Sequence, residues 1–235
     1  MQHKNLILLG TSHIAKQSMK EVEDAVYNEK PDIIAIELDR KRLPALLSKN
    51  KEIPPLSSIK HIGFKGYIFS IIGAWAERKL GNMVGVAPGS EMKRAVELAR
   101  ENALELALVD QDIQITLKRF SQELTWKEKR RFIADIFRGI FGKTEIQFDL
   151  RKVPSKKIIK QMIGKLRERY PGVYKVLIEE RNHAIAQNLS NLIKANPDKK
   201  ILAILGAGHV DEVSELIKSA ENEPSYTFSV DDQYI

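Results

Sequence analysis

The sequence contains no cysteine among its 235 residues. A disulfide framework and a thiolate metal site are therefore excluded. The chain also lacks an uninterrupted apolar run of the roughly 20 residues that a membrane-spanning helix needs. Its first residues lack the basic, apolar and small-residue order of a signal peptide. We therefore expect a domain that resides in the cytoplasm.

Positive charge is unevenly distributed along the chain. Residues 116–170 hold 16 Lys and Arg against six Asp and Glu, a net charge of +10 within a total of +7. Such a segment can contact acidic lipid, nucleic acid or an acidic partner, although a solvated helical face is its more common role. No aromatic RNA-binding signature or zinc-finger spacing accompanies it, so we expect no nucleic-acid partner.

Short apolar runs without clean alternation predict strands that are buried on both faces. They are Leu6–Leu9, Ile33–Glu37, Glu105–Val109, Ile201–Leu205 and Tyr226–Val230. Helical patterns lie between them, including Ile14–Asn28, a helix that begins near Ser90, a long one over about Pro171–Ala195, and Val210–Ala220. This alternation predicts an α/β fold with a central, mostly parallel or mixed sheet, formed by a single domain over residues 1–235.

Two further stretches predict helices outside this alternation. The basic stretch at about 117–169 has helical patterns without strands, which indicates a helical insert. The apolar stretch Phe64–Leu80 is expected to pack against the sheet or the insert. Its alternative role is a membrane-surface face or the interface of a homo-oligomer.

One sequence pattern, an apolar run followed by a GxxH motif, occurs twice in the chain. "LILLGTSHIA" and "LAILGAGHVD" each join an apolar run to a glycine, two small residues and a histidine, His13 or His209. Both histidines follow the carboxyl end of a predicted strand, the edge where open α/β sheets bind ligands. A sheet built from two related strand–GxxH–helix halves would bring them together. The glycines could instead cradle a phosphate, although neither stretch matches a nucleotide-binding motif.

A carboxylate is predicted at the same edge. In "IAIELDRKR", Glu37 closes an apolar run, and burying it costs several kcal/mol unless it is paired or binds a cation. His13, His209 and Glu37 form a plausible divalent-metal set with open positions, as a hydrolytic site requires. A structural ion pair between Glu37 and an arginine is the alternative.

Further charged residues are candidates for the same site. Glu180 and Arg181 flank the apolar stripe of the long helix, where each needs a partner. Glu180 could act as a general base or ligand and Arg181 could bind an oxyanion, or both could form structural ion pairs. The remaining candidates, expected to contact the substrate, are Arg40, Glu91, Asp110 and Asp112.

These pieces together resemble the TraB/PrgY (pheromone-shutdown) family, which is related to the Tiki metalloproteases. The resemblance is carried, in the family's order, by "GTSH", "IELDRKR", "GSEMKRAVELA", "LVDQDIQITLKR", "EERN" and "GAGHV". It implies two related α/β halves, within a wider superfamily of erythromycin esterases and ChaN-like proteins. Many archaeal-type members continue into a membrane-spanning C-terminal region, so the resemblance implies a domain of a longer, membrane-tethered protein.

The resemblance also implies an activity. In the Tiki branch the two GxxH histidines and a glutamate are associated with peptide hydrolysis that depends on manganese or cobalt. Transferred to this sequence, the ligands are His13, His209 and a glutamate, either Glu37 or Glu180. PrgY-like members are linked to reduced activity of peptide pheromones.

Two functional hypotheses follow. The first is a metal-dependent hydrolase of peptides or peptide signals, holding Mn²⁺, Co²⁺ or Zn²⁺, with Glu37 or Glu180 moving the proton and Arg181 positioning the substrate. The second is a non-catalytic module that binds a peptide or signal as the head of a membrane-associated protein. The second is supported by the basic patch and by the absence of a protease motif such as HExxH.

Overall fold

The computed structural model describes residues 2–11, 16–48, 89–141 and 156–222. Within these ranges, five strands form one sheet in the order β1-β2-β5-β3-β4. They are β1 (Gln2–His3), β2 (Leu6–Thr11), β3 (Ile33–Ile36), β4 (Glu105–Leu108) and β5 (Ile201–Gly206). Of these five strands, only the two-residue edge strand β1 is antiparallel to its neighbour, so the predicted mostly parallel α/β sheet is confirmed.

The two strands that precede the GxxH histidines lie side by side. β2 pairs with β5 in parallel, with Gly10 opposite Leu205 and Thr11 opposite Gly206. Gly10 and Gly206, the first residues of the two GxxH motifs, therefore lie at the same edge of the sheet. His13 itself lies outside the described residues, as do the predicted strand Tyr226–Val230 and the helical stretch Phe64–Leu80.

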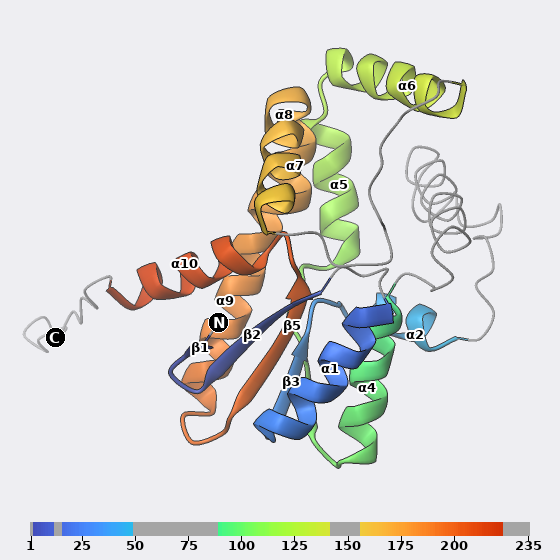
Figure 1. Ribbon diagram of the computed structural model, residues 1–235. Coiled ribbons are helices and arrows are strands. Elements are labelled where there is room, and N and C mark those ends of the chain that lie inside the picture. The colour runs from blue at the N-terminus through green and yellow to red at the C-terminus, as the bar shows by residue number, and fades with distance from the viewer. Residues whose placement is uncertain (1, 12–15, 49–88, 142–155, 223–235) are drawn as a thin grey trace, which may run out of the picture.

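Helices cover both faces of the sheet (Figure 1). α1 (Lys16–Glu29) and α4 (Ser90–Glu101) pack on one face, and α9 (Glu180–Ala195) and α10 (Val210–Asn222) pack on the other. Alternate strand residues supply the two cores, since successive side chains point to opposite faces. In β5, for example, Ala203 packs toward α9 and α10, whereas Ile204 packs toward α1 and α4. This double burial explains the apolar runs.

A helical layer stands beyond the carboxyl ends of the strands (Figure 1). It contains α5 (Ile113–Glu123), α7 (Lys156–Arg169) and α8 (Pro171–Tyr174), and α6 (Trp126–Phe141) extends past them. A small core of its own includes Phe120, Leu124, Val173 and Val176. The described parts of the basic stretch are thus helical, as the sequence predicted.

The predicted long helix is present, with one irregular turn. α8 continues through a π-helical turn, η2 (Lys175–Glu179), into α9. Single π-turns inside α-helices are frequent at functional sites. Here the turn ends immediately before Glu180 and Arg181. The short helix α2 (Arg42–Leu47) follows β3 at the same edge of the sheet.

Candidate functional site

Carboxylates that follow two strand ends meet one arginine from α9. Glu37 follows β3 directly and Asp110 comes two residues after β4. The Arg181 guanidinium donates to Asp110 through Nε (3.1 Å to Oδ1) and Nη2 (2.7 Å to Oδ2). Nη2 also donates to Glu37 Oε1, and Nη1 donates to the Leu177 carbonyl, 3.2 Å away. Arg181 therefore joins the ends of β3 and β4, and the ion pair left as the alternative for Glu37 is present.

Glu37 also contacts the strand that leads to His209. Its Oε2 accepts a hydrogen bond from the Gly206 amide at 2.6 Å, in a buried position at the end of β5. Its Oε1 lies 3.3 Å from His209 Nε2. Both side chains are almost fully buried, with exposed fractions of 4% and 7%. The structure thus brings together Glu37, Arg181 and His209, three of the predicted site residues.

A second arginine completes the network around Asp110. Arg42, in the first turn of α2, donates to Asp39 and to Asp110 Oδ2. Burial would raise the pKa of Asp110, but the hydrogen bonds and charges of Arg181 and Arg42 outweigh it, so its pKa lies below the ordinary value. Burial would likewise lower the pKa of Arg181, but the charges and hydrogen bonds of Glu37 and Asp110 have the larger effect, so its pKa lies above the ordinary value. Both groups are held in their charged forms.

His209 sits between the end of β5 and the first residue of α10. Its Nδ1 lies 2.5 Å from Asn182 Oδ1. Its Nε2 lies 3.5 Å from Arg181 Nη1 and also faces Glu37 Oε1. Asn182 is fully buried and donates through Nδ2 to Glu212 Oε2 at 2.8 Å. The imidazole is therefore fixed at both nitrogens.

Close packing at this edge of the sheet leaves little room for a side chain at Gly10. A Cβ there would lie 3.1 Å from Val210 Cγ2 and 3.3 Å from the Ala207 Cα, tighter than ordinary van der Waals contact. The missing side chain lets the turn that carries His209 approach β2. Close packing thus accounts for this glycine without a bound phosphate.

The other predicted site residues lie elsewhere. Glu180 accepts from Arg119 (2.6 Å from Nη2 to Oε1), on the side of the helical layer. Asp112 caps α5 by accepting from the Gln114 amide at 2.7 Å, and it pairs with Lys41 at 2.8 Å.

Two candidates remain. Glu91 is buried in the first turn of α4, and Arg40 is exposed. The partners found for Glu180 and Asp112, which are Arg119, Lys41 and the Gln114 amide, lie outside the network of Glu37, Asp110, Arg181 and His209.

Three members of the network escaped sequence analysis. Asn182 stands beside Arg181 in "EERN", and Asp39 and Arg42 stand within "IELDRKR". A polar amide on the buried side of α9 was a usable signal for Asn182. Choosing Arg42 over Arg40 needed the orientation of α2, which the sequence pattern does not give.

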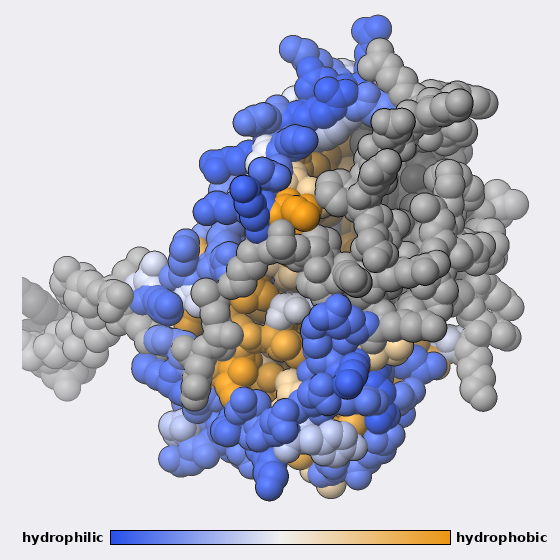
Figure 2. Space-filling model, viewed as in Figure 1, coloured by the Kyte–Doolittle hydropathy of each residue, from blue (hydrophilic) through white to orange (hydrophobic). Residues whose placement is uncertain are grey.

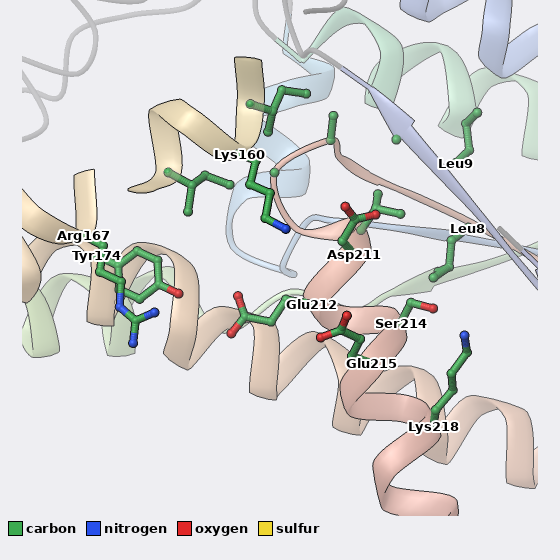
Figure 3. Close-up of a pocket in the computed structure, with 16 residues that line it drawn as sticks. Leu8, Leu9, Lys160, Arg167, Tyr174, Asp211, Glu212, Ser214, Glu215 and Lys218 are labelled. Atoms are coloured by element: carbon green, nitrogen blue, oxygen red, sulfur yellow. The ribbon is translucent and has the colours of Figure 1, made fainter. Parts of the chain in front are cut away.

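A pocket of about 940 Å³ opens beside the histidine turn. Its walls come from β2, α7, α8, the turn between β5 and α10, and α10 itself (Figure 3). The lining combines apolar side chains with cations such as Lys160 and Arg167 and with carboxylates such as Glu212 and Glu215. Figure 2 shows hydrophobic surface gathered between the helical layer and the sheet on the face seen in Figure 1.

The comparison with protein families decides the classification. The profile of the TraB/PrgY/gumN family matches residues 2–224, nearly the whole chain. The chain belongs to the TraB/PrgY/gumN family. The match spans both GxxH motifs and every residue of the network.

Individual relatives agree with this family. The uncharacterized protein MJ1365 of Methanocaldococcus jannaschii is 34% identical over 219 residues, 93% of this chain and 54% of the relative. TraB domain-containing proteins of Bos taurus and Homo sapiens are 21% and 20% identical over 88% of the chain and 61% of their own length. This TraB-family chain therefore spans little more than half the length of the curated relatives it matches.

The described residues were considered for a metal cluster and for a membrane-spanning helix, and they contain neither. Among the described residues, no three His, Asp or Glu side chains are grouped so that they could hold a metal ion. The third ligand predicted from sequence, His13, lies outside those residues. No helix in the described ranges is long and apolar enough to cross a membrane.

Proposed function

We propose that this TraB-family chain is a metal-dependent hydrolase that acts on peptides or peptide signals. The observation that carries the proposal is the orientation of His209. Asn182 occupies Nδ1, so Nε2 faces Glu37 Oε1 across 3.3 Å. Two ligands of one tetrahedral ion, with bonds of ~2.0–2.1 Å, stand roughly 3.3 Å apart. The donor types and their spacing therefore fit a divalent cation.

His209, Glu37 and, by sequence, His13 would hold the metal, with Mn²⁺, Co²⁺ or Zn²⁺ as candidates. When bound, the metal supplies a polarised substrate carbonyl and an activated water. Glu37, whose second oxygen accepts a hydrogen bond from the Gly206 amide, would be the group that accepts a proton from the water. Arg181 donates to Glu37 and lies beside His209, where its guanidinium would stabilise negative charge on the substrate oxygen.

The pocket supports a peptide as the ligand. It adjoins the turn that carries His209, since Ala207 and Gly208 line it. Its apolar side chains come from β2 and α7, and its carboxylates and cations come from α10 and α7. A lining that mixes apolar area with charges of both signs suits a peptide segment better than a phosphate ester.

A metal-loading experiment tests the proposal. Purified protein is incubated with Mn²⁺, Co²⁺ or Zn²⁺, dialysed, and its bound metal is measured by elemental mass spectrometry. We expect about one ion per chain in the wild type and none in a folded His13→Ala/His209→Ala variant. His183→Ala is the matched control, because His183 is exposed on α9. A peptide library then tests for cleavage that depends on the metal.

A non-catalytic peptide-binding module is the second candidate. It is favoured by the Arg181 guanidinium, which already bonds both Glu37 and Asp110 as a structural ion pair would. Equal peptide binding by wild type and the double-histidine variant, without metal in either, would support this second function and contradict the first.

A further inference from the structure

Asn182 has a defined orientation because its two neighbours differ in chemistry. Its Nδ2 lies 2.8 Å from Glu212 Oε2, and an ionised carboxylate only accepts hydrogen bonds. The amide nitrogen must therefore face Glu212. The amide oxygen is then directed at His209, and the side chain is fully buried between them.

This orientation dictates where His209 carries its proton. The Asn182 oxygen only accepts, so Nδ1, 2.5 Å away, must donate. A neutral imidazole that is protonated at Nδ1 has a lone pair at Nε2, and the Arg181 Nη1 donor lies 3.5 Å from that nitrogen. The tautomer of His209 is thus set by a chain of two hydrogen bonds that begins at Glu212.

We propose that Glu212 is a positioning residue that fixes the His209 tautomer through Asn182. Glu212 lies in the first turn of α10 and does not need to touch the imidazole. Its carboxylate also lines the pocket beside the turn, where Figure 3 shows it directed toward Tyr174. An occupant that binds this carboxylate competes with Asn182, which links the pocket to His209. The tautomer stands without the proposed hydrolysis, whereas its use in metal binding rests on that function.

The test reads the tautomer directly. Protein labelled with ¹⁵N-histidine is examined by NMR without metal or substrate, at a pH where His209 is neutral. The His209 signals are assigned by their loss in His209→Gln. The wild type is expected to carry the proton at Nδ1. Glu212→Ala frees the Asn182 amide to rotate, so we expect most of the proton to move to Nε2.

Three variants complete the comparison. Glu212→Gln keeps an oxygen that accepts from Asn182, so it should retain the wild-type tautomer. Glu215→Ala removes a pocket carboxylate one turn along α10 and should also leave the tautomer unchanged. Asn182→Leu, which can neither donate nor accept, is the second variant if Glu212→Ala does not fold, and it should lose the preference for Nδ1.

The proposal is overturned if the wild type carries the proton at Nε2. It is also overturned if Glu212→Ala and Glu215→Ala behave alike, or if Asn182→Leu retains the Nδ1 proton. A confirmed tautomer together with absent metal binding would leave the positioning role intact and contradict the hydrolase alone.

Discussion

Arg181 and Asp110 form a bidentate ion pair between α9 and the end of β4, with nitrogen–oxygen distances of 3.1 and 2.7 Å. The Asp110 side chain is fully buried, and the same guanidinium also bonds Glu37. Arg181 thus pairs with two buried carboxylates, of which Asp110 also pairs with Arg42, so the stability of this edge of the sheet depends on Arg181 above all through Glu37.

Replacing Arg181 by methionine should destabilise the fold strongly. Removing one partner of a buried ion pair leaves uncompensated charge and costs about 3–5 kcal/mol. Arg119→Met is the matched control, because the Arg119–Glu180 pair is partly exposed and such pairs contribute about 0–1 kcal/mol. Denaturant unfolding measures both. Equal losses in the two variants would contradict the central role of Arg181.

The low pKa of Asp110 predicts a pH dependence of stability. A carboxyl group whose pKa falls below 3.8 on folding stabilises the native state above that value, and the stabilisation is lost as the pH falls toward the folded pKa. Asp110→Asn should therefore flatten the decline in the free energy of unfolding that begins below about pH 5 and continues as the pH falls past 3.8. The exposed Asp198→Asn should keep the wild-type decline. Parallel curves for wild type and Asp110→Asn would refute this.

The packing at Gly10 predicts opposite effects for two glycines. Gly10→Ala forces a methyl against Val210 and the turn that carries His209, which should cost about 1–3 kcal/mol. Gly164→Ala, in a helix with nothing within 4 Å of the new methyl, should stabilise by about 0.5–1 kcal/mol. Thermal and denaturant unfolding compare the two. A Gly10→Ala variant as stable as the wild type would show that the turn has room.

The sequence left Glu37 and Glu180 as alternatives for the catalytic glutamate. We expect substitutions at these two positions to have different effects on metal binding and peptide cleavage. Glu37→Gln removes the charge next to His209, so both metal binding and any metal-dependent peptide cleavage should be lost. Glu180→Gln acts on a pair with Arg119 in the helical layer, and cleavage should stay within about twofold of the wild type. Metal content and cleavage rates are measured side by side. Loss of cleavage in Glu180→Gln alone would reverse the assignment.

Much of the fold could be predicted because the signals are local. The apolar runs at Ile33–Ile36 and Ile201–Leu205 predict strands covered on both faces, and the helices between them imply parallel pairing. The two-residue strand β1 was missed, since so short a segment carries no periodic pattern. The π-turn before Glu180 was missed for the same reason.

The sequence by itself determined which residues reach the carboxyl edge of the sheet: Glu37, Asp110 and His209 each follow a strand, and connectivity leaves them no other place. Only the tertiary structure decided how they are used. Arg181 and Glu180 are adjacent in the chain but lie about 100° apart around a helix, so one enters the buried network and the other pairs with Arg119. Asn182 and Glu212 lie 30 residues apart, and only the packing of α9 against α10 lets them orient His209. Hydrogen bonds of this kind depend on angles between elements, which no local pattern encodes.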